Sequence, residues 1–182
     1  MIRSMKQGIL NLAVFKVAWT AVVVSAAAGV PVIGVIAVAI AVGIHLRTCD
    51  NPESEIRLLL AAAAMGFAWE STLVYSGLLS YSSGNLLPGI APYWIVAMWI
   101  LFATTLNASM RWLRRNKAVA AVAGAIGGPM GFFAGASAGA VELASPVVAL
   151  ACIGVGWAVM LPLLAHVAGR LESGPQLVGQ SA

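Results

Sequence analysis

Charged residues are scarce in this sequence. Asp, Glu, Lys and Arg make up only 9% of the 182 residues, while 61% are hydrophobic. Soluble domains carry about 25% charged residues. Together with a mean hydropathy of +0.95, this composition places the chain in a membrane, as one small helical bundle.

Cysteine and histidine are also rare, with two residues of each. Cys49 and Cys152 lie far apart and belong to no C-x-x-C or Cys/His cluster, so the sequence predicts neither a disulfide framework nor a zinc site. Two histidines are too few for the multi-histidine di-iron sites of membrane desaturases. His45 and Cys49 stand four residues apart and could hold a metal, but such a pair at a helix end is more typical of an interface. We expect no metal and no cofactor.

Six apolar runs separated by turn signals predict an all-α polytopic membrane protein with six transmembrane helices in one compact bundle. The basic N-terminus resembles a signal peptide, but the next apolar run follows at once, so we interpret it as an uncleaved first span. The predicted transmembrane domain covers residues 1–168, and residues 169–182 form a short cytoplasmic tail. The predicted spans are residues 9–28, 30–46, 56–79, 93–113, 118–141 and 146–168.

Basic residues mark every second connection between these runs. The connections at Gly29, at residues 80–92 and at residues 142–145 contain no Lys or Arg. Under the positive-inside rule, both termini are cytoplasmic and the protein is a multi-pass protein of the cell inner membrane. The pI near 9.5 then reflects attraction to anionic lipid and not a nucleic-acid surface. Apart from Lys16, the basic residues near span ends are Arg3, Lys6, Arg47, Arg57, Arg111, Arg114, Arg115, Lys117 and Arg170.

A carboxylate inside the third run is the strongest functional signal. Glu70 lies about 20 Å from the cytoplasmic edge by helical rise. A charge at that depth usually faces a bundle interior, pairs with another group or exchanges protons; the alternative is a structural hydrogen bond. Lys16 on the first span either pairs with Glu70 or extends its ammonium to the interface.

These residues predict a polar pocket that opens towards the cytoplasm. Thr104, Asn107 and Arg111 recur at spacings of three and four on the fourth span, which suits either helix packing or a pocket wall. The candidate pocket or ligand-binding residues are Glu70, Lys16, Asn107, Thr104 and Ser71.

A glycine ridge follows the fifth run, where Gly127, Gly131, Gly135 and Gly139 recur every four residues. Such a ridge lets another helix approach closely, either within the bundle or from a second copy. Pro129 in the same run should kink or break the helix. The alternative to close packing is a broken helix that lines a substrate site, as in transporters.

No enzyme motif is complete. Residues 135–139 match the G-x-S-x-G pattern around Ser137, but this serine lies near the outer edge. His45 and His166 lie at cytoplasmic ends, about 25 Å away by helical rise. No base reaches the serine, so we predict no catalytic residue.

Several segments resemble a known family. They are YWIVAMWILFATTLNASMRWL, GAIGGPMGFFAGASAGAVEL, NLAVFKVAW near the start and the Glu70–Ser71 pair. Together they resemble the bacterial membrane proteins of domain-of-unknown-function family 2878. In the family pattern, glutamine stands at the position of Lys16, aspartate at Glu70 and histidine at Ala108. The family has no established activity, and the resemblance implies an association with membrane-lipid modification.

These observations predict an integral inner-membrane protein that handles a lipid or small molecule through the pocket around Glu70, as a transporter or lipid-binding module. The alternative is a non-catalytic accessory subunit of a membrane-lipid-modifying system, which packs through the glycine ridge on a second copy or on a partner membrane protein. An intramembrane enzyme is the third alternative. Membrane lipid is the expected partner in each case, and nucleic acid is not.

Overall fold

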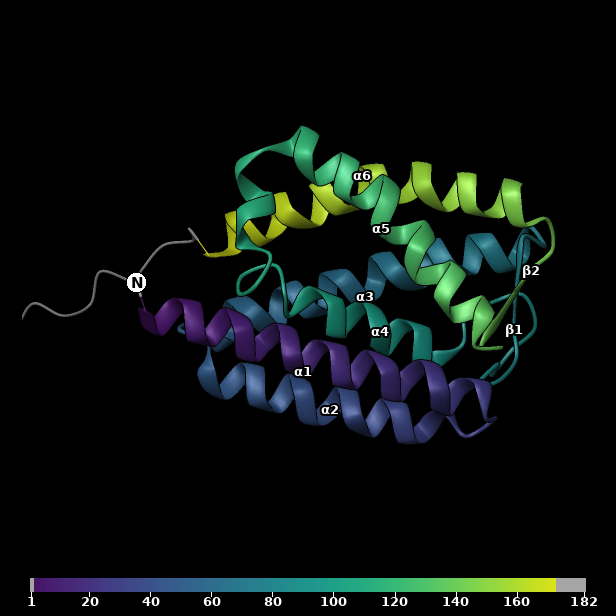
Figure 1. Cartoon of the computed structure of the whole chain (residues 1–182), viewed down its shortest axis with the longest axis horizontal. Helices are drawn as coiled ribbons and strands as arrows, with labels where there is room; N and C mark the ends of the chain where they lie inside the picture. The colour runs from purple at the N-terminus through teal and green to yellow at the C-terminus, as the bar shows by residue number, and fades with distance from the viewer. Residues whose placement is uncertain (1, 173–182) are drawn as a thin grey trace, which may run out of the picture.

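The computed structural model of the protein describes residues 2–172. Six α-helices run back and forth between two ends of the molecule (Figure 1). They are α1 (Ile2–Ala27), α2 (Pro31–Thr48), α3 (Pro52–Tyr75), α4 (Tyr93–Ala103), α5 (Lys117–Ser137) and α6 (Pro146–Glu172). The strands β1 (Leu79–Tyr81) and β2 (Val141–Leu143) and the 3-10 helix η1 (Arg111–Arg115) are shorter. The predicted tail lies outside the described residues from position 173 onward.

Five of these helices are long and apolar enough to cross a membrane, namely α1, α2, α3, α5 and α6. The expected helical architecture is therefore confirmed, and the five helices fit a membrane protein. α4 differs, because its 11 residues rise only about 16 Å, roughly half of a hydrocarbon core of about 30 Å. The predicted continuous fourth span over residues 93–113 is wrong, since its helix ends at Ala103.

Hydroxyl side chains explain the early end of α4. Thr104 Oγ1 donates to the Leu101 carbonyl and Thr105 Oγ1 to the Phe102 carbonyl, each at 2.7 Å. Such bonds compete with regular helix formation. Turns occupy residues 104–110, so Thr104, Asn107 and Arg111 do not form the predicted helical stripe. Irregular backbone at this depth is tolerated because it is covered by protein, and Thr105 is fully buried.

Asparagines begin two of the long helices. The Asn51 side chain accepts a hydrogen bond from the Ser54 amide at 3.2 Å, and Pro52 occupies the first turn of α3. The Asn116 side chain accepts from the amides of residues 118 and 119 and so caps α5. The sequence Asn51-Pro52 is therefore the start signal of α3, which begins four residues before the predicted span.

Three helices end in the same way at one end of the molecule. α1, α3 and α5 each stop before a glycine in the left-handed region: Gly29, Gly77 and Gly139 have φ of 77°, 73° and 85°. Their amides bond back to carbonyls of the last helical turn, as in a Schellman motif. A left-handed residue is cheapest as glycine. The same turn thus closes three successive helical hairpins.

The strands join two of these hairpins. β1 pairs antiparallel with β2, with Leu79 opposite Leu143 and Tyr81 opposite Val141. α3 and α5 must therefore end at the same end of the molecule, which we call the strand end (Figure 1). Residues 82–116, including α4, return the chain to the opposite end. Two three-residue strands carry too little periodicity for the sequence analysis to have detected them.

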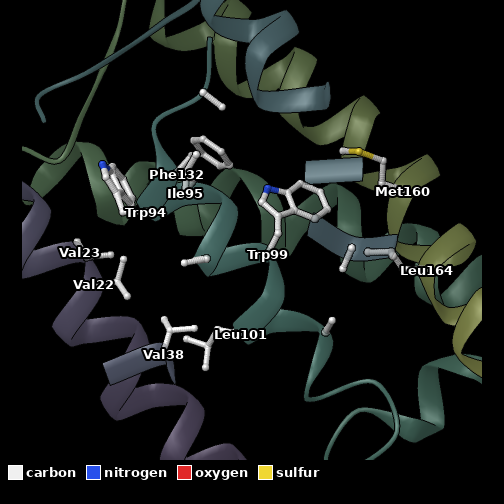
Figure 2. Close-up of a cluster of buried hydrophobic side chains, with 14 of the residues drawn as sticks. Val22, Val23, Val38, Trp94, Ile95, Trp99, Leu101, Phe132, Met160 and Leu164 are labelled. Carbon is white, nitrogen blue, oxygen red and sulfur yellow. The ribbon is translucent and has the colours of Figure 1, made fainter. Parts of the chain in front are cut away.

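The opposite end is the basic end. Apart from Lys16, the basic residues lie here. They are found near the starts of α1, α3 and α5, near the ends of α2 and α6, and in η1. Between the two ends, α4 lies inside the bundle, where it packs against α3, α2 and α1. Figure 2 shows Leu101 beside Val38 of α2, while Trp99 points towards the side of α6 that carries Met160. Trp94 and Leu101 are almost completely buried.

Candidate functional site

Glu70 is fully buried on α3, near the strand end. Its carboxylate accepts one hydrogen bond from Tyr81 Oη of β1 at 2.7 Å and one from Trp99 Nε1 of α4 at 3.0 Å. Lys16 is exposed on α1 and makes no ion pair with Glu70. The geometry matches the interpretation of Glu70 as a structural hydrogen-bonding residue, and the alternative ion pair with Lys16 is not formed.

Aromatic packing fixes the Trp99 donor. Its ring lies directly over Gly66, where a Cβ atom would overlap the indole. The ring also stacks on Trp157 of α6, with centroids 4.7 Å apart and planes at 23°. Phe102 packs its edge against Trp157 at 5.2 Å. Glu70 is therefore enclosed by rings and small residues, and no part of it is exposed.

The neighbouring Ser71 holds the connection that precedes α4. Its Oγ accepts a hydrogen bond from the Ala91 amide at 3.1 Å. Glu70 and Ser71 thus fasten β1 and the start of α4 to α3. A ligand could reach the Glu70 carboxylate only if Tyr81 or Trp99 moved.

A second polar cluster lies at the basic end and crosses four segments of the chain. His45 Nε2 lies 2.9 Å from Glu55 Oε2, and both side chains are only 7% exposed. The other Glu55 oxygen accepts from Asn107 Nδ2 at 2.7 Å, and Asn107 Oδ1 accepts from Arg114 at 2.7 Å. We call His45, Glu55, Asn107 and Arg114 the basic-end network.

Glu172 extends this network to the surface. Its carboxylate bridges two arginines, with Arg114 at 2.7 Å and Arg111 at 2.8 Å. The Arg114 side chain is 15% exposed, whereas that of Arg111 is 61% exposed. The α6 helix therefore continues past Gly169, where the sequence analysis placed the start of the tail, and its last described residue belongs to the cluster.

Beside the network lies a pocket of about 580 Å³ between η1 and α6. We call it the arginine pocket, because four arginines line it. Trp112, at its rim, is 55% exposed. The lining residues are Arg111, Trp112, Arg114, Arg115, Ala165, His166, Gly169 and Arg170.

The five predicted pocket residues do not share one place. Glu70 and Ser71 lie near the strand end, and Lys16 is exposed on α1. The Thr104 hydroxyl bonds within its own turn, and its carbonyl accepts from Asn11 at 3.1 Å. Asn107 alone belongs to the basic-end network, and none of the five lines the arginine pocket.

Three of the four glycines of the predicted ridge have open space beside them within the chain, whereas Gly135 is buried. A Cβ atom at Gly127, Gly131 or Gly139 would have no neighbouring atom within 4 Å, whereas one at Gly135 would touch Val141 at 3.5 Å. Two other glycines of α5, Gly124 and Gly128, pack closely against α6. A Cβ at Gly124 would overlap the Trp157 carbonyl, and one at Gly128 would overlap the Trp157 ring.

Pro129 does not break α5, which continues from Lys117 to Ser137. Proline lacks the amide that would bond to the carbonyl of Ala125, four residues earlier. Gly154 of α6 lies against both groups: its built Cβ would be 3.2 Å from the Ala125 oxygen and 3.3 Å from the Pro129 ring. Close approach of α6 thus covers the freed carbonyl, and the broken-helix interpretation is wrong.

Cys49, at the end of α2, is not built as a nucleophile. Burial raises the pKa of its thiol, and the nearby Glu55 carboxylate raises it further. Reactive cysteines have a lowered pKa instead.

Ser137 Oγ donates to the Phe133 carbonyl at 2.8 Å. Within residues 2–172, no three His, Cys, Asp or Glu side chains gather as a metal site.

Sequence reasoning missed Glu55, Arg114, Glu172, Tyr81 and Trp99 as site residues. Residues 111–117 carry four basic side chains, and this cluster was the available signal for the arginine pocket. It was interpreted only as a mark of orientation. No local pattern links Glu55 with Asn107, or Glu70 with Trp99, because their contacts join segments 52 and 29 residues apart.

Comparison with known proteins identifies a family. The family model described as "Protein of unknown function (DUF2878)" matches residues 8–163. No curated protein and no solved structure matches the chain.

Proposed function

Since the chain belongs to the DUF2878 family of proteins of unknown function, we propose a function from its own geometry: it binds a phosphate-bearing lipid head group, or a small phosphorylated molecule, in the arginine pocket. It does so as an integral inner-membrane protein with six passes, in which the shorter α4 and the turns after it make the fourth. The membrane character follows from the five long apolar helices.

One observation carries this proposal, namely that Arg114 is held in place before any ligand arrives. Its guanidinium is bound by Asn107, Asn107 by Glu55 and Glu55 by His45. An arginine fixed in this way loses little side-chain entropy when it binds an anion. Arginine also matches the geometry of phosphate oxygens through paired N–H groups.

The contacts of Glu172 support the proposal, because they place an anionic group against two of the pocket arginines. Its carboxylate already bridges Arg111 and Arg114 with short contacts of 2.8 and 2.7 Å. The two guanidinium groups therefore lie close enough together to contact one anionic group. Arg115 and Arg170 add two further positive charges to the pocket.

The position of the pocket favours a lipid head group over a dissolved anion. The positive-inside rule assigns the basic end to the cytoplasm, so the pocket lies at head-group depth in the inner leaflet. Basic pockets between helices on this side are typical binding sites for anionic lipids. An exposed Trp112 at the rim suits the same interface.

The enclosed Glu70 favours a binding module over a proton-coupled transporter. Its carboxylate has no exposed atom and both oxygens are bonded. We therefore replace the predicted pocket around Glu70 by the arginine pocket as the place where a lipid or small molecule binds.

The test measures the thermal stability of the full-length protein in detergent with added ligand. Short-chain phosphatidic acid should raise the melting temperature, whereas short-chain phosphatidylcholine should not. The double variant Arg115→Gln/Arg170→Gln should weaken the affinity for phosphatidic acid at least about tenfold, since the two lost charged contacts are together worth more than about 1.4 kcal/mol.

Arg47→Gln is the matched control, because Arg47 is exposed at the basic end but does not line the pocket. If the control and the double variant lost affinity for phosphatidic acid equally, the effect would come from overall charge. That result would contradict the proposal. Inorganic phosphate is the third ligand: stabilisation by phosphate as strong as that by phosphatidic acid would identify a soluble phosphorylated ligand. No stabilisation by either would refute the site.

A further inference from the structure

Lys16 carries an exposed charge at the middle of a membrane span. The apolar part of α1 runs from Lys6 to Ala27. Lys16 is ten residues from its start and eleven from its end, so its Cα lies about 15 Å from either edge. A lysine stem reaches only about 6 Å, which leaves the ammonium well inside the hydrocarbon.

Within residues 2–172, no acidic side chain is paired with this ammonium. All six acidic residues lie within residues 2–172, and none of the ion pairs there involves Lys16. Four of the acids are already bound by other groups, and the remaining two lie outside the helices, after α2 and in β2. The six acids are Asp50, Glu53, Glu55, Glu70, Glu142 and Glu172.

The surface around Lys16 is suited to a neighbouring helix. Ala13, Val17 and Thr20 are exposed on the same side of α1, at spacings of three and four. Thr20 Oγ1 donates to the Lys16 carbonyl at 2.9 Å, so its own hydroxyl needs no further partner. Small side chains such as those of Ala13 and Thr20 let a second backbone approach closely in a membrane.

We propose that this face of α1 binds a membrane-spanning helix of a partner protein that carries Asp or Glu near its midpoint. Charges inside a bilayer are costly and usually pair with one another. An ammonium in the middle of the membrane is best complemented by a carboxylate at the same depth. The proposal is independent of the arginine pocket, which lies at the basic end.

A second copy of this chain does not fit the same face. A symmetric contact would bring two Lys16 ammonium groups together, and like charges at this depth repel strongly. On the long apolar helices, Glu53, Glu55 and Glu172 lie within a turn of a helix end, and Glu70 is fully buried near the strand end. The partner is therefore a different chain.

The test uses the full-length protein in phosphatidylcholine vesicles with synthetic leucine–alanine helices of about 20 residues. One helix carries a central Asp and the other a central Leu, and association is measured by energy transfer from a labelled protein. The Asp helix should associate at least about tenfold more tightly than the Leu helix. Lys16→Met should abolish this preference, and Lys16→Arg should retain it.

A transplanted lysine provides the matched control. Val159 of α6 is 63% exposed, near the middle of its helix. In Lys16→Met/Val159→Lys, the charge is kept at similar depth but the α1 face is lost, and the preference should fall. Equal binding of the Asp and Leu helices to the wild-type protein would overturn the proposal, as would a preference that follows the lysine undiminished to α6. The first of these results would indicate that lipid phosphate or water serves Lys16.

Discussion

Glu70 is a buried carboxylate held by hydrogen-bond donors and not by an opposite charge. Tyr81 and Trp99 approach it from β1 and α4, so one side chain joins three elements. Hydrogen bonds to charged or buried groups contribute about 1.5–3 kcal/mol each, and an unmade one costs a similar amount. The two donors are the reason that this residue can stay inside the bundle without Lys16.

Removal of one donor should therefore destabilise the fold. Tyr81→Phe leaves the Glu70 oxygen unsatisfied and should lower the free energy of unfolding by about 1–3 kcal/mol. Thermal or denaturant unfolding in detergent would measure the loss. Tyr75→Phe is the control, because Tyr75 is 86% exposed, and it should leave stability unchanged.

The Glu70→Leu background separates this bond from other effects of the Tyr81 ring. Without the acceptor, the hydroxyl has nothing to hold, so Tyr81→Phe should cost much less there than in the wild-type protein. Equal losses in both backgrounds would rule out the Glu70–Tyr81 bond as the source of the stability.

Among the helices, α5 and α6 form the most extensive contact, and glycine makes it possible. Gly124 and Gly128 lie under Trp157, and Gly154 of α6 lies over the carbonyl that Pro129 leaves free. The helix survives its internal proline because this packing protects the exposed backbone group. The face with Gly127 and Gly131 points away from this contact.

These two glycine series should respond in opposite ways to alanine. Gly124→Ala drives a methyl group into the Trp157 backbone and should cost about 1–3 kcal/mol of stability. Gly127→Ala has open space and removes a flexible residue from mid-helix, so it should be neutral or stabilise by about 0.5–1 kcal/mol. Melting temperatures in detergent distinguish the two. A large loss in Gly127→Ala would indicate that a second copy covers the outer face.

The whole molecule has two chemically different ends. The strand end closes with three left-handed glycines and the pairing of β1 with β2, while the basic end holds the arginine pocket and its network. The pairing places the connections after α3 and α5 on one side. The segment between them must then cross the bundle, which α4 alone is too short to do, and turns 104–110 with η1 supply the rest.

Cysteine labelling in intact cells should reveal this arrangement. With Cys49 and Cys152 replaced by serine, an impermeant maleimide should label Leu87→Cys and Ser145→Cys from the periplasm and Ala118→Cys only after the cells are opened. All three side chains are exposed. Ser54 and Ser83 would be poorer labelling sites, because Ser54 is only 7% exposed and the Ser83 hydroxyl donates to the Ala26 carbonyl. Labelling of Leu87→Cys and Ser145→Cys from opposite sides would contradict the strand pairing.

The sequence analysis predicted the helices well where the signal is local. Apolar length and the break at Gly29 are properties of neighbouring residues, and the boundary between α1 and α2 follows them closely. Gly139 was predicted inside the fifth span, whereas in the structure it follows the end of α5. The burial of Glu70 was also predictable, because a carboxylate inside an apolar run has few other places to go. The end of α4 was not, because threonines that bond to the preceding turn also occur inside helices, as Thr20 and Thr72 do here.

Composition and charge order alone determined that this is a helical membrane protein with one basic end, since the hydrophobic effect and the cost of buried charge act on each segment separately. Only the tertiary structure decided which donors meet Glu70, which glycines face Trp157, and that Arg114 stands on a chain of contacts back to His45. Those contacts join segments remote in sequence, and they depend on how the helices are rotated about their axes. A rotation of one helix by a single residue position turns a pocket wall into a lipid face, and no local pattern records that choice.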